Sequence, residues 1–403
     1  MSSHQILQGV RVVDMTQYLS GPTVTRLMAE HGADIIKIEQ APFGDPVRTL
    51  AFHKDGRSGY FVQQNRGKRS LCIDFDAPEG RAALDELIAR ADVLVQNYGP
   101  GVLERRQLDW KSLATKHPRL IMASISGFGK DGPFSHKTAF DLIAQAYSGL
   151  LYLTGPVDGP PTPVGTSYAD VMSGVHAVAG IGFALYHRER TGEGQHIDIS
   201  MVDSLFHAHE ISVQGPSITK GRWKAKRLGS RPTLNSPFGV YKAAEGYIVL
   251  QVMTAQWAGF CRAMGRPELE TDERFCDMNA RHKNAIELND LIEAWLIALP
   301  TDAAAFALLE AERVPCAPVL PPDQAIGHPY FEARGMVRVV EDPIIGPMHI
   351  PGNPLRMSAQ PEVLTLTAPL LGQHNGEILR ELGYDDARVA AMEAAGTLRS
   401  AAT

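Results

Sequence analysis

An aspartate at the start of a long helical pattern is the side chain best suited to covalent chemistry. Residues 167–188 form a run of apolar and small residues, and Asp170 would lie in its first turn, just after the possible caps Thr166 and Ser167. There the helix dipole favours the ionised carboxylate, which is the form that attacks carbonyl groups. An acidic residue in a first turn is also simply a favourable helix start. Spacing alone therefore makes Asp170 a candidate nucleophile but does not show that it acts as one.

A glycine-rich stretch after a predicted strand has the spacing of a dinucleotide-binding loop. Gly127, Gly129 and Gly132 form a literal GxGxxG, which in that fold opens a helix towards a pyrophosphate. Here Pro133 follows at once, residues 134–138 do not read as a helix start, and the stretch does not follow the first strand. We interpret it as a loop at a strand end that could line a ligand site, and we set nicotinamide binding aside.

Histidines and basic residues are weaker candidates. His176 and His187 lie on the same helical run, but no triad partner is apparent, so packing or surface roles are the simpler interpretation. A stretch of basic residues could bind phosphate groups, although clusters of charged residues in linkers are usually just exposed to solvent. This stretch comprises Arg222, Lys224, Lys226, Arg227 and Arg231.

The elements that must position these residues alternate between β-branched runs and helical patterns, as parallel α/β sheets do. Such a pattern predicts a large Rossmann-like domain with an open parallel sheet. Gly174, Gly180 and Gly182 predict that 167–188 is a buried helix in close contact with a neighbour, with Gly192 as its terminator. The strand candidates are 10–13, 35–38, 71–75, 93–95 and 120–125, and the helix candidates between them include 23–31 and 78–91.

The character of the sequence changes near residue 225. Short strands at 239–241 and 247–252, followed by helical patterns, predict a smaller α+β domain. A proline-rich stretch, 314–322, reads as a linker. The predicted organisation is 1–224 for the large domain, 225–325 for the small domain and 326–403 for a C-terminal segment that returns to the large domain.

Composition argues against several classes of protein. With 403 residues, 44% of them hydrophobic, the chain can bury more than one core. The formal net charge of −6 does not indicate binding to nucleic acid or to an anionic membrane, for which a basic bias is expected. Any anionic ligand must therefore be bound by positive charges local to its site. The longest uncharged run, 171–187, falls just short of a membrane span, and the first residues lack a signal-peptide pattern. Four scattered cysteines without zinc spacing are expected to be free thiols, so we expect a cytoplasmic protein with no metal and no nucleic-acid partner.

Several segments, taken in order, resemble the class III CoA-transferase family, which includes formyl-CoA transferase, carnitine CoA-transferase and the related 2-methylacyl-CoA racemases. Any single piece is weak, but the ordered set is specific and spans nearly the whole chain. The matching segments are LQGVRVVD (7–14), SGP (20–22), GADIIKIE (32–39), Gly44-Asp45 with Arg48, NRGKRS (65–70), NYGPG (97–101), SGFG (126–129), TGEGQ (191–195), GVY (239–241), ARGM (333–336) and ELGY (381–384).

The resemblance implies two identical chains threaded through each other as interlocked rings, each with a large Rossmann-like domain and a small domain joined by two linkers. It also implies that Asp170 is the nucleophile, which forms first a mixed anhydride with the acyl group and then an aspartyl-CoA thioester. No permanently bound cofactor is implied, since the CoA thioester and the carboxylic acid are substrates. An alternative is that this chain is the CoA-binding subunit of a heteromeric transferase.

The resemblance further implies a set of CoA contacts. Arg105 suits a phosphate because the CoA nucleotide is strongly anionic while this protein is net acidic, and Lys137 could serve beside it. Formyl-CoA transferase carries an arginine where this chain has Gln40, so that contact is weakened or lost. The implied CoA-binding residues are Ser20, Ile73, Asp74, Asn97, Tyr98, Gly99, Arg105, Lys137 and Thr138.

Two departures from the family concern the substrate pocket, which is expected to include Phe140 and Asp141. The racemases carry a histidine before this aspartate as half of their acid/base pair, so Phe140 disfavours racemase activity unless Asp141 or His136 supplies the proton. The glycine-rich loop of formyl-CoA transferase is expected after 247–250, but 251–254 has no glycine, which predicts a pocket for an acid larger than oxalate. Succinyl-CoA or a similar dicarboxylic thioester is expected as donor, by analogy with the family.

Overall fold

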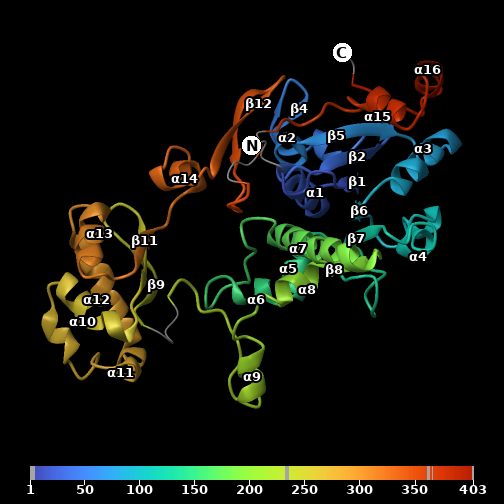
Figure 1. Ribbon diagram of the computed structural model, residues 1–403. Coiled ribbons are helices and arrows are strands. Elements are labelled where there is room, and N and C mark those ends of the chain that lie inside the picture. The colour runs from blue at the N-terminus through green and yellow to red at the C-terminus, as the bar shows by residue number, and fades with distance from the viewer. Residues whose placement is uncertain (1–4, 232–235, 361–363, 365, 402–403) are drawn as a thin grey trace. The chain divides into compact units, whose positions relative to one another are not determined.

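The computed structural model describes residues 5–231, 236–360, 364 and 366–401. Contacts divide the chain into two compact units, which Figure 1 draws in the colours of the sequence. Residues 149–164 and 210–224 lie in the second unit, so the compact units and the domains predicted from the sequence are bounded at different residues. The first unit contains Met1–Ser148, Gly165–His209 and Ile326–Thr403, and the second contains Gly149–Val164 and Glu210–Ala325.

The first unit is built on a sheet of six parallel strands in the order β5-β2-β1-β6-β7-β8. Strand interiors are buried on both faces, which explains their Val- and Ile-rich sequences. The predicted open parallel sheet is confirmed. Its edge strand β8 was not predicted, because HIDIS alternates polar and apolar residues and only its last two residues are buried. The strands are β1 (Arg11–Met15), β2 (Asp34–Gln40), β5 (Lys68–Ile73), β6 (Val93–Gln96), β7 (Ile121–Ser126) and β8 (His196–Ser200).

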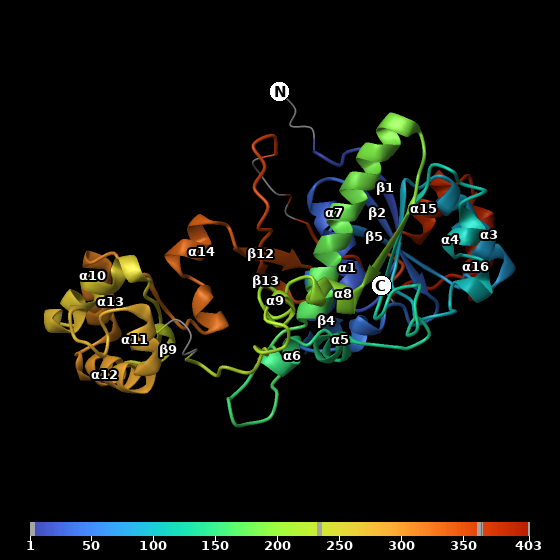
Figure 2. The ribbon, with the colours of Figure 1, turned by 90° about the horizontal axis from the view of Figure 1, so that it is seen from below.

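Helices cover both faces of this sheet. Figure 2 shows α3, α4, α15 and α16 on one side of the strands and α1 and α7 on the other. Pro78 occupies the first turn of α3, as the sequence predicted, since its missing N–H would be unpaired there in any case. The helices of the first unit are α1 (Ser20–Glu30), α2 (Gly59–Asn65), α3 (Pro78–Ala89), α4 (Trp110–Leu113), α5 (Asp141–Tyr147), α7 (Tyr168–Thr191), α8 (Met201–Phe206), α14 (Pro329–Ala333), α15 (Asn375–Glu381) and α16 (Asp386–Ala394), with 3-10 turns η1 (Pro46–Thr49) and η2 (Glu104–Arg106).

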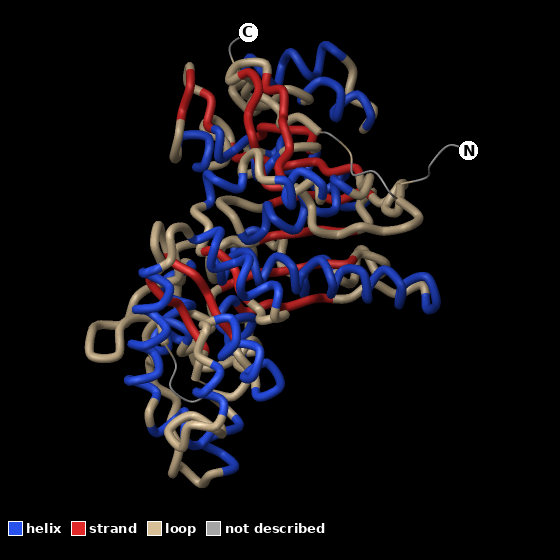
Figure 3. Tube along the Cα trace, turned by 90° about the vertical axis from the view of Figure 1, so that its left-hand side faces the viewer, coloured by secondary structure: helices blue, strands red, loops and turns tan. Residues whose placement is uncertain are grey.

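The long helix α7 runs lengthwise beside the strands (Figure 3). A Cβ at Gly174 would lie 2.9 Å from the carbonyl oxygen of Ser20, so this glycine permits the close contact with α1. A Cβ at Gly182 would have no atom of another residue within 4 Å in the single chain. The prediction of a buried helix is wrong for the single chain, because only one flank of α7 packs on the unit. The exposed apolar residues of its other flank are Val171, Val175, Phe183 and Tyr186.

By length and composition alone, α7 could also cross a membrane, with a mean hydropathy of 1.3 over its most apolar window. The bent pair α12 and α13 passes the same test as one broken span. Core helices of α/β proteins satisfy these criteria too, and α7 packs against α1, β7 and β8 within its unit. The apolar character of its packed flank follows from covering the sheet.

The C-terminal segment lies along the edge strand β5. The backbone N–H of Cys72 donates to Asn375 Oδ1 at 2.9 Å, and that of Asp74 donates to the carbonyl oxygen of Thr397 at 2.7 Å. A hairpin earlier in the segment is held by Arg57, whose guanidinium donates to Asp342 Oδ2 at 2.8 Å. The two hairpins of the unit are β3 (His53–Lys54) with β4 (Arg57–Ser58) and β12 (Val337–Asp342) with β13 (Gly346–Pro351).

The second unit has its own hydrophobic core between helices and a three-stranded antiparallel sheet in the order β11-β10-β9. The prediction that 314–322 is a linker is partly wrong, because Cys316–Pro318 pairs with β10 as β11. Prolines are tolerated there because β11 is an edge strand. The elements are α6 (Leu150–Leu153), α9 (Gln214–Ile218), β9 (Phe238–Lys242), β10 (Tyr247–Gln251), α10 (Trp257–Ala263), α11 (Met278–Lys283), α12 (Ala285–Ala298), α13 (Asp302–Ala311) and β11 (Cys316–Pro318), with 3-10 turns η4 (Thr254–Gln256), η5 (Pro267–Glu270) and η6 (Pro322–Ala325).

Candidate functional site

A cavity of about 690 Å³ lies in the first unit, where the segments that follow three neighbouring strands meet the start of α7. Residues 17–20 follow β1, residues 97–100 follow β6, and Gly127 follows β7. The sheet order reverses between β1 and β6, and ligands of open α/β sheets bind beyond the carboxyl ends of the strands at such a switch point. The cavity therefore occupies the place in this fold where a binding site is expected.

Asp170 lies in the first turn of α7 and lines this cavity. Burial and, second to it, the Asp141 carboxylate raise the pKa of its carboxyl to about 7, against a hydrogen bond from Ser20 that lowers it. The dipole argument predicted that the helix would favour the ionised form, but loss of hydration outweighs that effect here. Asp170 is therefore ionised less readily than an ordinary exposed aspartate, contrary to the expectation from the dipole.

The helix start is capped by a residue that is distant in the sequence. Neither Thr166 nor Ser167 caps α7 through its side chain, contrary to the prediction. Instead, Asp141 Oδ1 accepts from the backbone N–H of Ala169 at 2.7 Å and from that of Asp170 at 3.4 Å. Helix α5 thus supplies the acceptor that a local cap would normally provide.

Asn97 holds the segment that follows β1. Its Oδ1 accepts from the Gln17 N–H at 2.8 Å, and its Nδ2 donates to the Gln17 carbonyl oxygen at 2.7 Å and to Ser20 Oγ at 3.1 Å. Tyr18 within this segment has a φ of 62°, which is rare for a residue other than glycine. The side chain of Asn97 therefore fixes a strained segment that carries Ser20 towards Asp170.

A buried ion pair supports the same segment from β2. Lys37 Nζ donates to the carbonyl oxygen of Thr16 at 2.8 Å and lies 2.8 Å from Asp45 Oδ2. Burial alone would lower the pKa of Lys37, but Asp45 and Asp14 raise it above its ordinary value. We did not predict this pair, although a lysine in the middle of a buried β-branched run is a signal that could have indicated it.

The structure brings most of the predicted site residues together. Those lining the cavity are Ser20, Asn97, Tyr98, Gly99, Lys137, Thr138, Phe140, Asp141 and Asp170. Three others do not line it: Ile73 is fully buried, Asp74 accepts a hydrogen bond from Gln40 Nε2 at 2.8 Å, and Arg105 is exposed in η2. Their roles as CoA contacts stay predictions.

Aromatic residues also line the cavity, and several of its lining residues were not predicted as site residues. Tyr18 meets Phe140 edge to face at 5.9 Å, and Phe140 is 68% exposed. Burial raises the pKa of Tyr60 to about 12, with Asp170 as the next cause. Gln17, Tyr18 and Tyr60 carry no motif that would have marked them, because only folding brings their segments beside α7.

The other candidate residues lie outside this cavity. His176 bonds through Nδ1 to the carbonyl oxygen of Met172 at 2.8 Å, and His187 is exposed. The GxGxxG stretch forms no helix start, as predicted, because α5 begins only at Asp141. Arg227 of the basic stretch donates to three backbone carbonyl oxygens, and Arg231 pairs with Glu293. The remaining basic residues, Arg222, Lys224 and Lys226, line a hollow of about 620 Å³ in the second unit.

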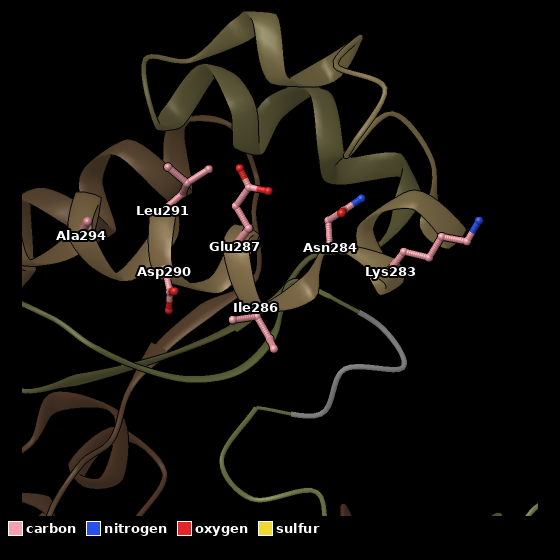
Figure 4. Close-up of a pocket in the computed structure, with 7 residues that line it drawn as sticks. All are labelled: Lys283, Asn284, Ile286, Glu287, Asp290, Leu291 and Ala294. Atoms are coloured by element: carbon pink, nitrogen blue, oxygen red, sulfur yellow. The ribbon is translucent and has the colours of Figure 1, made fainter.

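A further hollow of about 560 Å³ lies along α12, but its side chains do not converge. Figure 4 shows Glu287 and Leu291 pointing to one side of the helix and Ile286 and Asp290 to the other. Ile286 is 78% exposed. Binding sites need a few polar groups that converge on one ligand, so the cavity around Asp170 is the better candidate.

Within the described part of the chain, no group of three or more His, Cys, Asp or Glu side chains could hold a metal ion. Cys72, Cys261, Cys276 and Cys316 are free thiols, as predicted. The chemistry that the cavity offers is that of a partly buried carboxylate with hydroxyl, amide and aromatic neighbours. Such a group can act as a nucleophile towards an acyl carbon.

Comparison with known proteins gives consistent results. The chain is 38% identical to the succinyl-CoA:mesaconate CoA-transferase of Haloarcula marismortui, over 94% of this chain and 97% of that protein. It is 35% identical to the formyl-CoA:oxalate CoA-transferase of Streptomyces avermitilis, over 97% and 99% respectively. The crystal structure of a CAIB/BAIF family protein from Brucella suis matches with a TM-score of 0.82 and 32% identity, over 94% and 100%. Because residues 7–375 also match the model of CoA-transferase family III, the chain belongs to that family and is a class III CoA-transferase.

Proposed function

We propose that this enzyme moves CoA from an acyl-CoA donor to a carboxylic acid through covalent intermediates on Asp170. The observation that carries the proposal is the position of this carboxyl group, which lies in the cavity at the switch point of the sheet together with eight of the other eleven predicted site residues. Ser20 and Asn97 belong to two of those motifs, and both help to hold the site. CoA thioester and acid are substrates, so the proposal requires no resident cofactor.

The proposed reaction proceeds through two kinds of covalent intermediate. The Asp170 carboxylate attacks the thioester carbon of the donor, which gives a mixed anhydride and releases the CoA thiolate. The thiolate attacks the aspartyl carbonyl, which gives aspartyl-CoA thioester and frees the donor acid. The acceptor carboxylate then repeats these steps in reverse order, so that the acceptor leaves as its CoA thioester and Asp170 is regenerated. Each step replaces one acyl bond by another, and no redox partner is needed.

The electrostatics of the cavity suit a carboxylate nucleophile. With a pKa raised to about 7 by burial, Asp170 is partly ionised at neutral pH. A carboxylate with a higher pKa is more basic and therefore a better nucleophile than an exposed one. The aromatic pair of Tyr18 and Phe140 offers an apolar wall for the acyl group or the pantetheine arm.

The donor proposed here is succinyl-CoA or a similar dicarboxylic thioester. The relative from Haloarcula marismortui is named for succinyl-CoA and mesaconate, and that from Streptomyces avermitilis for formyl-CoA and oxalate. Only the first of these names has a dicarboxylic thioester, succinyl-CoA, and it supports the proposed donor. A panel of donors and acceptors, followed by chromatography of the CoA esters, identifies the pair.

We further propose that two identical chains interlock as rings in the cytoplasm. The support from this chain is the exposed apolar flank of α7, where Phe183 is 76% exposed. An exposed flank of this kind is costly in water and is covered when a partner packs on it. If two identical chains form the enzyme, the purified chain should be active. If the chain is instead a subunit of a heteromeric transferase, the purified chain alone should be inactive.

The nucleophile is tested by trapping. The enzyme is incubated with an active acyl-CoA and hydroxylamine, and its peptides are examined by mass spectrometry. We expect a hydroxamate at Asp170, and an active enzyme without label at this residue would contradict the mechanism. Asp170→Ala should abolish transfer while the protein stays folded by circular dichroism. A loss of less than tenfold, about 1.4 kcal/mol of transition-state stabilisation, would mean that another group is the nucleophile.

A further inference from the structure

The first turn of α7 depends on a carboxylate from another helix. Its second and third residues, Ala169 and Asp170, donate their backbone N–H groups to Asp141 Oδ1 at 2.7 and 3.4 Å. The second oxygen, Asp141 Oδ2, accepts from Gln145 Nε2 at 2.7 Å. Gln145 is buried on the same helix and also donates to the carbonyl oxygen of Thr166 at 3.4 Å. The start of α7 is therefore tied to α5 at three points.

We propose that Asp141 is a positioning residue for Asp170, which it orients through the two backbone amides that it holds. The inference rests on the proposed function, in which Asp170 is the nucleophile. A nucleophile must approach the acyl carbon within about 3–3.5 Å in the correct direction, so a shift of the turn that carries it slows the reaction. An ionised acceptor makes stronger hydrogen bonds to amides than a neutral one, and it matches the positive end of the helix dipole.

Asp141 has a second effect, because its negative charge lies beside the carboxyl that it orients. Burial is the larger cause of the raised pKa of Asp170, Asp141 is the next, and the Ser20 hydroxyl opposes them. Tyr60 of α2 faces the same carboxyl, and Lys137 lines the same cavity. The other charged or titratable side chains on the elements packed against α7 are not among the causes of this shift: these are Arg26 and Glu30 of α1, Tyr147 of α5, His196 and Asp198 of β8 and Asp203 of α8.

The two effects are separated by two substitutions. Asp141→Asn keeps an oxygen that can accept from the amides but removes the charge, whereas Asp141→Ala removes both. Above pH 8, where Asp170 is ionised in both proteins, we expect the asparagine variant to lose less of its rate than the alanine variant, because it keeps an oxygen that accepts from the two amides. We expect the alanine variant to lose more than tenfold in kcat at every pH. Asp203→Asn, which removes an exposed carboxylate from α8, is the matched control.

The charge effect is measured without a substrate. Water-soluble carbodiimide reacts with protonated carboxyl groups, and mass spectrometry of the Asp170 peptide gives the extent of labelling as a function of pH. The labelling midpoint should lie near 7 in the wild type. In Asp141→Asn it should fall by about one pH unit, the lower end of the range for one neighbouring charge. In Asp203→Asn it should stay unchanged.

Each outcome decides for or against the inference. A midpoint that Asp141→Asn leaves in place, or an alanine variant with the wild-type kcat, would overturn it. Should the alanine variant fail to fold, the titration of the asparagine variant still tests the inference. Failure of the proposed function looks different: the wild type would transfer no CoA from any donor in the panel, while the labelling midpoint would still move with Asp141.

Discussion

Replacing the proposed nucleophile should make the protein more stable. Burial is the main cause that raises the pKa of Asp170 from its ordinary 3.8 to about 7, so the folded chain holds this carboxylate at a cost in free energy when it is ionised. At about 1.4 kcal/mol for each pKa unit, the full cost is about 4 kcal/mol. This is an upper limit, because the side chain is partly exposed and water screens some of the charge. Asp170→Asn removes the charge and keeps the shape of the side chain.

The sign of the pH dependence follows from proton binding. Between pH 3.8 and 7 the folded protein holds a proton on Asp170 that the unfolded chain has lost, so stability falls as the pH rises through this window. Below pH 3.8 Asp170 is protonated in both the folded and the unfolded protein, so its ionisation costs no stability. Above pH 7 it is ionised in both, and the full cost applies. The free energy of unfolding of the asparagine variant should therefore exceed that of the wild type by up to about 4 kcal/mol at pH 8 and by up to about 2 kcal/mol at pH 5.

Urea unfolding of both proteins at the two pH values, followed by circular dichroism, measures this difference. Protein concentrations are matched, since a dimer gains apparent stability from mass action. Asp203→Asn serves as the control for loss of an exposed carboxylate. An asparagine variant that is no more stable than the wild type at pH 8, or an advantage that grows as the pH falls, would refute the reasoning.

Two other predictions concern α7 and the choice of reaction. Gly174→Ala should destabilise the protein by about 1–3 kcal/mol, because its Cβ would lie 2.9 Å from the carbonyl oxygen of Ser20. A urea midpoint equal to that of the wild type would contradict this prediction. With Phe140 where racemases carry a histidine, the enzyme should exchange no α-hydrogen of a 2-methylacyl-CoA in deuterium oxide. Deuterium uptake that disappears in Asp170→Ala, detected by mass spectrometry, would favour racemisation.

Local pattern and motif order were enough to predict most of the parallel sheet, the family and part of the cavity. Parallel strands are buried on both faces, so β1, β2, β6 and β7 appear as β-branched runs that need no tertiary information. The position of Asp170 in the first turn of a helix follows from a similar local signal. The cavity residues Ser20, Asn97 and Tyr98 came from the ordered motifs, which are specific because all of them occur together.

The surroundings of Asp170 could not be predicted in this way, because they depend on contacts between segments that are distant in the sequence. Thr166 and Ser167 satisfy the local rule for a cap, but folding brings the carboxylate of Asp141 to the same amides. The dipole of α7 favours an ionised Asp170, but burial raises its pKa. The carboxylate loses more hydration free energy on burial than it gains from the helix dipole. Electrostatic effects of this kind depend on burial and distance, and both are properties of the packed protein.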